Sequence, residues 1–466
     1  MDVITITLLF VGLILFFGSF AEFIFKRFGI PDVLFLIILG FIIGPSALGY
    51  VSPTDLQIIA PIFTTFTLVF LLFDGSFNIN LASLKKEFTD SIVLTGWNFF
   101  ISTIVVTSIM LLFGFDWKLS LLAGFTLGGV SSSFVIPVLK QMNLSPKIFS
   151  LLTLESALTD VFSIVFSLAV IQFMQLGDFG LQSTFTQIVA LFAVGAAMGI
   201  VAGVLWFILV VKVFKEHNYM LTIAYLLVIF VVTEFLQGSG AIAALFFGLV
   251  LNNSRKISSI LRGITSTDAV KKEMAIKGDL GISITTRNEE FFYNQISFFL
   301  KTFFFVYIGI LIDIRDTKIL IIGILISVAV MLSRRSSIIL KKIVGQEHKG
   351  IIDSMFARGL AAAAIAQIAV QSELPVAKEL ASIAYVVITG TIILASANIF
   401  IDRWRAPKTQ KKEDIKKNPI QKRIEATNQA IKIKKQEITK KSKRKKSRAS
   451  KKVIKKVNKK TSKTKR

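Results

Sequence analysis

A succession of long apolar segments, each bounded by polar residues, constrains the fold of this 466-residue chain more than any other feature. Most of these segments are about 20 residues long, the length at which an α-helix crosses a bilayer. Each is expected to be helical, because an isolated helix satisfies its own backbone hydrogen bonds in lipid. We predict about 13 membrane-spanning helices, at residues 3–25, 31–49, 57–78, 90–114, 118–139, 148–175, 185–213, 219–236, 239–252, 291–313, 318–340, 350–371 and 379–400.

The composition indicates the same class of protein. Hydrophobic residues make up 53% of the chain and the mean hydropathy is +0.69, too apolar for a soluble domain. We therefore predict an all-α polytopic membrane protein. The chain has no cysteine, which excludes disulfides and thiolate chemistry. His217 and His348 are far apart, so we expect no zinc site, and there is no G-x-G-x-x-G motif to indicate a nucleotide-binding domain. We also expect no cofactor, no resident metal and no enzymatic activity.

The net charge of +25 comes almost entirely from the C-terminal end of the chain. Residues 402–466 contain 28 Lys and Arg against five Asp and Glu, whereas residues 1–401 contain 26 against 24. We predict a transmembrane domain at 1–402 and a disordered, Lys-rich tail at 403–466. No nucleic acid is expected to bind the transmembrane domain. The tail is either a solvated segment or one that contacts anionic lipid headgroups.

The predicted loops alternate between strongly basic ones and nearly neutral ones. By the positive-inside rule the basic loops are cytoplasmic. An odd number of spans then places the N-terminus outside and the tail in the cytoplasm, in a multi-pass protein of the cell membrane. The longest internal loop, 253–290, falls on the cytoplasmic side, and its role is open.

Seven ionisable residues are predicted to lie inside the spans, where each costs about 3 kcal/mol even on lenient insertion scales. Counted from their polar cytoplasmic flanks at ~1.5 Å per residue, they lie roughly 10–20 Å into the membrane and form one layer. Each therefore needs a partner or a function. For Lys301, one of the seven, we favour a structural role. The seven are Asp74, Glu155, Asp160, Lys301, Arg334, Arg335 and Arg358.

Glu155 and Asp160, both in the sixth segment, are expected to face different neighbours. Five residues at about 100° each put the two side chains about 140° apart around the helix. Glu155 lies at the same predicted depth as Arg334, so these two are expected to form a structural ion pair. Asp160 shares a face with Ser156 and has Thr159 beside it. That side of the helix offers oxygen ligands for a monovalent cation or a proton.

Two segments carry residues that predict interrupted helices. GGVSSSFVIP at 128–137 places two glycines, three serines and a proline in mid-membrane, where freed carbonyls and hydroxyls can line an ion site. ARGLAAAAIAQ at 357–367 favours a second break, at which Arg358 either holds the break or contacts the substrate. Close packing of small residues is the alternative interpretation of both segments. The three serines are Ser131, Ser132 and Ser133.

Several stretches, in order along residues 5–400, resemble the monovalent cation/proton antiporter superfamily. Glu155, Ser156 and Asp160 in ESALTDV resemble the Glu-Ser-x-x-Asn-Asp motif of its sodium/proton exchanger branch. Any one match is weak, but together and in order they are strong. The other matching stretches are IPDVLFLIILGFIIGPSALG (30–49), LLFDGSFNI (71–79), SGAIAALFFGLVLNN (239–253), FFFVYIGILID (303–313), LSRR (332–335) and ARGL (357–360).

The resemblance implies roles for individual residues. In that branch the motif aspartate binds either a proton or the cation, a role that maps to Asp160. The motif serine and the acid of the third helix contribute to the cation site, which maps to Ser156 and Asp74. The motif glutamate pairs with an arginine of the eleventh helix, which maps to Arg334, with Arg335 as the substitute.

The resemblance also implies a fold with inverted repeats, two discontinuous crossing helices and a homodimer. The implied function is secondary active exchange of a monovalent cation, with Na⁺ favoured, for protons. Cation and proton would compete for Asp160, and a core domain would move against a dimeric scaffold to give alternating access. One aspartate with a Glu–Arg pair implies electroneutral exchange of one proton for one cation.

Two departures from the family pattern leave the cation open among Na⁺, K⁺ and Li⁺. Thr159 stands where the exchanger branch has Asn, and SSSFV is nearer to the Ser-Ser-Thr of potassium-efflux-type relatives. Two other functions are also open. A channel-like conductor would use the same spans, although the sequence has no recognisable selectivity-filter motif. A membrane platform for a polyanion-binding tail would leave the charges inside the spans unexplained.

Overall fold

The structure of the protein is a computed structural model, and it forms two units, Met1–Trp404 and Arg405–Arg466. Only the first unit is described below. Most of the predicted 253–290 loop and nearly all of the predicted tail lie outside the described residues. These are 3–28, 31–56, 59–76, 81–140, 142, 146–176, 181–210, 213, 219–253, 287–336 and 349–405.

Among the described residues, all regular structure is helical, which confirms the predicted all-α fold. Each predicted apolar segment coincides with one helix, except that the fifth and the twelfth are each divided into two. Apart from the short 3-10 helix Pro53–Leu56, the helices are α1 (Val3–Phe28), α2 (Asp32–Ile43), α3 (Ile59–Ser76), α4 (Leu81–Leu112), α5 (Trp117–Thr126), α6 (Ser132–Lys140), α7 (Pro146–Leu176), α8 (Leu181–Leu209), α9 (Tyr219–Phe235), α10 (Gly240–Asn252), α13 (Arg287–Leu311), α14 (Thr317–Ser336), α16 (Lys349–Asp353), α17 (Leu360–Gln371) and α18 (Ala377–Arg405).

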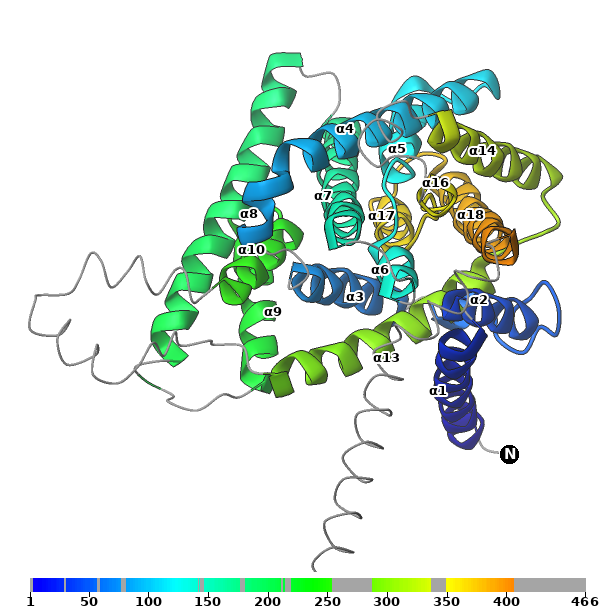
Figure 1. Ribbon diagram of the computed structural model, residues 1–466, viewed down its shortest axis with the longest axis horizontal. Coiled ribbons are helices and arrows are strands. Elements are labelled where there is room, and N and C mark those ends of the chain that lie inside the picture. The colour runs from blue at the N-terminus through cyan, green and yellow to red at the C-terminus, as the bar shows by residue number, and fades with distance from the viewer. Residues whose placement is uncertain are drawn as a thin grey trace, which may run out of the picture. The chain divides into compact units, whose positions relative to one another are not determined.

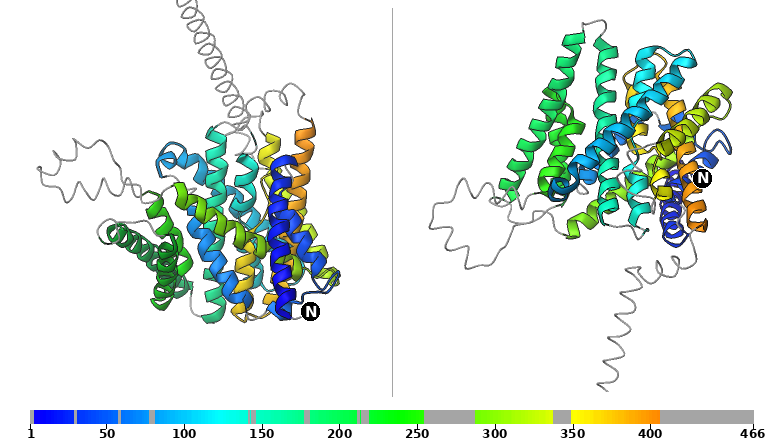
Figure 2. Two further views of the ribbon diagram at one scale, coloured as in Figure 1. Left: turned by 90° about the horizontal axis from the view of Figure 1, so that it is seen from below. Right: turned by 45° about the horizontal axis from the view of Figure 1, so that its top comes forward.

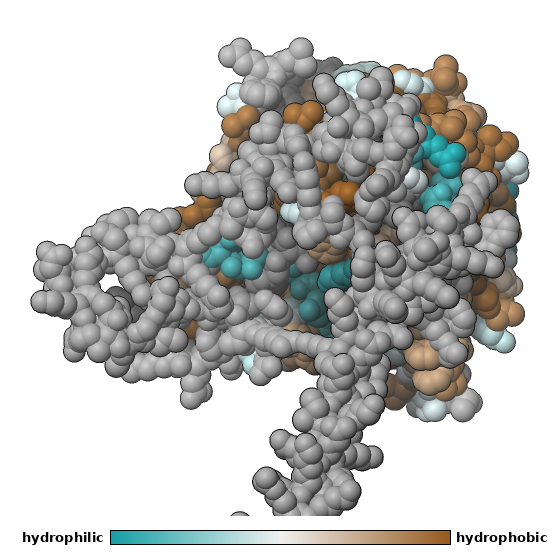
Figure 3. All heavy atoms as spheres, viewed as in Figure 1, coloured by the Kyte–Doolittle hydropathy of each residue, from teal (hydrophilic) through white to brown (hydrophobic). Residues whose placement is uncertain are grey.

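The outer surface of the bundle is apolar, as a lipid environment requires. Eight of the described helices are long and apolar enough to cross a membrane. Large apolar side chains point outward from the bundle, for example Leu112 on one of these eight helices and Phe235 on the shorter α9, both 84% exposed. Figure 3 shows apolar residues over much of the coloured surface, with polar residues in small groups. The membrane-protein class predicted from composition is thus supported by the surface.

The divided segments α5–α6 and α16–α17 lie in the interior of the bundle, as Figures 1 and 2 show. The helix α7 packs against α4, α5, α6 and α17, while α3 packs against α10, α13 and α17. The long helix α13 passes below α3 and α6 toward α2, against which it packs. The interior therefore contains two helix breaks surrounded by full-length helices.

The two helix breaks contact each other, which confirms the predicted pair of discontinuous crossing helices. The first break lies between Thr126 and Ser132, and the second between Asp353 and Leu360. The amide N–H of Ser131, in the first break, donates a hydrogen bond of 2.9 Å to the carbonyl of Ala357 in the second. The divided segments come fifth and twelfth among the thirteen predicted. Each is therefore the fifth of a group of six, 1–6 or 8–13, and an inverted repeat places its interrupted helices at such corresponding positions.

Gly359 shows why the second break needs a glycine. A Cβ atom built on Gly359 would lie 2.5 Å from the Cβ of Ser131 and closer still to its Oγ. Any larger residue would push the two crossing segments apart. The glycine of the Arg-Gly pair that predicted the second break is thus needed for its close contact with the first.

Candidate functional site

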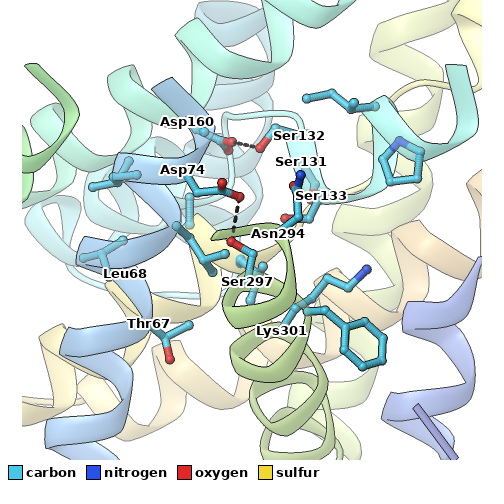
Figure 4. Close-up of a pocket in the computed structure, with 18 of the residues that line it drawn as sticks. Thr67, Leu68, Asp74, Ser131, Ser132, Ser133, Asp160, Asn294, Ser297 and Lys301 are labelled. Carbon is cyan, nitrogen blue, oxygen red and sulfur yellow. Dashed lines mark hydrogen bonds between the residues drawn. The ribbon is translucent and has the colours of Figure 1, made fainter. Parts of the chain in front are cut away.

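A cavity of about 510 Å³ opens where α3, α6, α7 and α13 meet. It reaches the first helix break, and hydroxyl, amide and carboxyl side chains line much of its wall (Figure 4). Four acids and two lysines line it, so its ionisable groups favour cations. They are Glu22, Asp32, Asp74, Lys140, Asp160 and Lys301.

Asp160 lies in α7 and faces this cavity directly beside the first helix break. Its Oδ2 accepts a hydrogen bond of 2.6 Å from the hydroxyl of Ser132, the first residue of α6. Ser131 and Ser133 line the same cavity. The structure therefore brings together the carboxylate and the hydroxyl-rich break that the sequence singled out separately.

Asp74, near the end of α3, is the second carboxylate in this part of the cavity. Its Oδ2 accepts a hydrogen bond of 2.6 Å from the hydroxyl of Ser297 on α13. Figure 4 shows Asp74 and Asp160 next to each other, each with its serine. In the part of the chain that the structure describes, no Lys or Arg lies within ion-pair distance of either carboxylate.

Of the cavity wall contributed by α13, only Lys301 was singled out from the sequence, and as a structural residue. Asn294, Ser297 and Lys301 line the cavity at spacings of three and four residues, which places them on one face of the helix. The same spacing is visible in the sequence, where polar residues interrupt an otherwise apolar segment. That polar stripe is the signal that could have identified α13.

Ser156 and Thr159 are placed differently from the prediction. Both are buried, and neither lines the cavity. The Ser156 hydroxyl donates to the carbonyl of Thr153 at 3.0 Å. The Thr159 Oγ1 accepts a hydrogen bond of 3.0 Å from the amide N–H of Val130, in the first helix break. Thr159 therefore packs against the first break, and neither hydroxyl reaches the cavity wall that carries the Asp160 carboxylate.

Glu155 forms the predicted ion pair with Arg334. Both side chains are almost completely buried, and the two terminal guanidinium nitrogens of Arg334, Nη1 and Nη2, donate to the carboxylate, with Nη2 at 2.9 Å from Oε2. The amide of Asn98 on α4 adds a hydrogen bond of 2.7 Å, which the sequence did not reveal. Arg335 is exposed instead and donates to Asn398 at 3.2 Å, so the pairing belongs to Arg334.

Arg358 is buried beside this ion pair and does not line the large cavity. Its Nη1 donates a hydrogen bond of 2.5 Å to the carbonyl of Gly129 in the first break. Its amide N–H donates to the hydroxyl of Thr391 on α18 at 3.0 Å. Of the two roles predicted for Arg358, these contacts favour holding the helix breaks together.

A second cavity of about 170 Å³ lies farther along α7 and α17. On α7 the two linings meet, because Ile164 lines the large cavity and the next residue, Val165, lines the second. On α17, Ala364 lines the large cavity and Ile368, one turn later, lines the second. At 1.5 Å per residue, about 6 Å of helix separates the two linings on α17.

Comparisons with known proteins agree with this arrangement. The chain resembles the solved sodium proton antiporter MjNhaP1 from Methanocaldococcus jannaschii, with a TM-score of 0.67 and 19% identity over 85% of this chain and all of that one. It is 24% identical to the K(+)/H(+) antiporter NhaP of Alkalimonas amylolytica, over 55% of this chain and 45% of the relative. It is 26% identical to the probable Na(+)/H(+) antiporter 2 of M. jannaschii, over 43% of this chain and 47% of the relative.

The chain spans less than half the length of these two curated relatives. The match to a family extends much further. Residues 12–401 match the family described as "Sodium/hydrogen exchanger, transmembrane". This match covers nearly the whole helical bundle, including both helix breaks and the Glu155–Arg334 pair, and so the chain belongs to the sodium/hydrogen exchanger family.

Proposed function

We propose that this protein exchanges a monovalent cation for protons across the cell membrane, and that Asp160 carries either one. The observation that carries the proposal is the position of the Asp160 carboxylate, which faces the large cavity beside a helix break and accepts a hydrogen bond from the Ser132 hydroxyl. An ionised Asp160, together with serine oxygens, offers hard ligands to a dehydrated cation. A protonated Asp160 is neutral and releases it.

The second carboxylate, Asp74, supports the same proposal because it places negative charge in the same cavity. Glu155 is neutralised by Arg334 and does not line the cavity. We assign Ser156 and Thr159 to supporting α7 and the helix break, rather than to direct cation contact.

The two cavities fit an alternating-access mechanism. They lie toward different ends of α7 and α17; their linings meet on α7 and are about one helical turn apart on α17. A small displacement of the broken-helix core could then close one cavity and open the other toward Asp160. The proposed exchange is one proton for one cation, which makes it electroneutral.

Reconstituted vesicles test the proposed function directly. Purified protein in vesicles with an internal pH dye should move protons when Na⁺ is added outside, and the rate should not change when a membrane potential is imposed. K⁺ is the second candidate, because SSSFV resembles potassium-efflux-type relatives and one relative is named a K(+)/H(+) antiporter. Cation flux without proton counterflux would contradict the proposal and indicate a channel.

The proposed orientation, with the N-terminus outside and the tail in the cytoplasm, is testable because the chain contains no cysteine. Single cysteines can be placed at Lys140, which lines the large cavity, and at Ser372, which lines the second. In intact cells a membrane-impermeant maleimide should label Ser372→Cys, and it should label Lys140→Cys only after the cells are permeabilised. The reverse pattern would show that the proposed orientation is inverted. Labelling of both cysteines from outside would show that the two cavities do not open on opposite sides of the membrane.

A further inference from the structure

The large cavity contains a positive charge of its own that is held at the wall. The ammonium of Lys301 on α13 lies 2.6 Å from Oδ2 of Asp32, at the start of α2, and both residues line the cavity. The exposed fractions of these side chains are 16% and 6%. A lysine ammonium carries the same single charge as the proposed substrate, so its position affects what the cavity can bind.

Lys301 is one helical turn from Ser297, the α13 residue that contacts the Asp74 carboxylate. Ser297, four positions earlier on α13, donates to Asp74. Figure 4 shows Ser297 pointing toward Asp74, while the Lys301 side chain extends away from Asp74 and Asp160. Without Asp32, the flexible four-carbon stem of Lys301 could turn its ammonium toward the cavity interior.

The helices that carry this pair are held together independently of it. A Cβ atom on Gly40 of α2 would overlap the carbonyl oxygen of Val306 and lie 2.8 Å from its carbonyl carbon. One on Gly309 of α13 would lie 2.8 Å from the Cα of Gly40. Contact between the two backbones therefore fixes α2 against α13. The ion pair is not needed to bring these helices together. Its distinctive effect is to determine where the Lys301 ammonium lies.

We propose that Asp32 holds the Lys301 ammonium against the cavity wall, away from Asp74 and Asp160, and that it thereby sets the apparent affinity of the site for the transported cation. Asp32 and Lys301 act in this proposal as positioning residues. The inference rests on the proposed function, because the competing ligand is the monovalent cation that Asp160 carries. A released ammonium would compete with that cation for the same carboxylates.

The test compares Asp32→Asn, Lys301→Met and the double variant in vesicles, over a range of Na⁺ concentrations. Asp32→Asn should raise the KM for Na⁺ by about tenfold or more with little change in the maximal rate, because Na⁺ and the ammonium compete for the same charge. The double variant, which has no ammonium to release, should return the KM to near the wild-type value. Lys378→Met, which removes an exposed lysine outside the cavity lining, is the matched control and should change neither quantity.

A purely structural ion pair gives a different result. It predicts that Asp32→Asn lowers stability or maximal rate without raising the KM, or that the double variant is no better than the single one. Either result would overturn the proposal. The Na⁺-dependent rise in the unfolding temperature of each purified variant reports binding without transport. If wild-type vesicles show no exchange, the proposed function fails, whereas the binding comparison still decides whether Asp32 shields the site.

Discussion

Replacing Asp160 by Asn is expected to abolish cation-driven proton flux while the protein still folds. The Asn side chain has nearly the same shape and can still accept the hydrogen bond from the Ser132 hydroxyl. It cannot become negatively charged to hold a cation, nor take up the proton that releases one. Proton flux in vesicles measures the loss, and the unfolding temperature of the purified variant reports whether the fold is intact.

Two further variants make this result specific to Asp160. Glu379→Gln removes an exposed acid of α18 that does not line the cavity, and it should transport like the wild type. Asp74→Asn removes the other carboxylate near Asp160, and it should retain exchange with weaker cation affinity. If Asp74→Asn abolishes exchange and Asp160→Asn does not, the carrier is Asp74 and the proposed mechanism is wrong.

The helices and their two breaks were predictable because each depends on a local property of the sequence. Segment length and hydropathy locate the spans, since the thickness of the bilayer sets the length and its hydrocarbon core requires apolar side chains. Glycine, serine and proline in mid-membrane located the first break, and Arg-Gly followed by small residues located the second. Even so, the second helix is shorter than predicted, because it ends at Ile43 and the chain then turns from Gly44 onward.

The partners of the charged residues were only partly predictable. Matching depths suggested Glu155 with Arg334, since depth follows from counting residues along each span. Asp32 was missed as the partner of Lys301 because it stands at the end of a span, where a charge is readily explained by the interface. The depth of a charged residue does not say which neighbouring helix its side chain faces in the membrane plane. The partner of each charged residue therefore depends on how the helices pack.

Thr159 shows the same limit at the level of one helix. Helical spacing puts its side chain about 100° from that of Asp160 around α7. It does not say which neighbour that angle faces, and the neighbour is the backbone of Val130 in the first break. A residue can therefore belong to the sequence motif around a carboxylate and still support the site by packing against the helix break, without lining the cavity.

Replacing Arg334 by Met is expected to destabilise the fold more than any of the cavity-lining substitutions above. It leaves the Glu155 carboxylate buried without its partner, and breaking a buried ion pair in this way costs about 3–5 kcal/mol. The double variant Glu155→Gln, Arg334→Met should be less destabilised than Arg334→Met alone, since it removes the buried charge together with its partner. Unfolding temperatures of all variants, measured in the same detergent, give the comparison.

The neighbouring arginine supplies the control for this prediction. Arg335→Met makes the same chemical change one residue along α14, at an exposed side chain with a single hydrogen bond to Asn398. Its effect should stay within about 0.5 kcal/mol, as for most surface substitutions. Equal losses for the two arginines would show that the pairing seen in the structure does not determine stability. If the double variant is well folded but cannot exchange cations, the Glu155–Arg334 pair takes part in transport as well as in holding the core together.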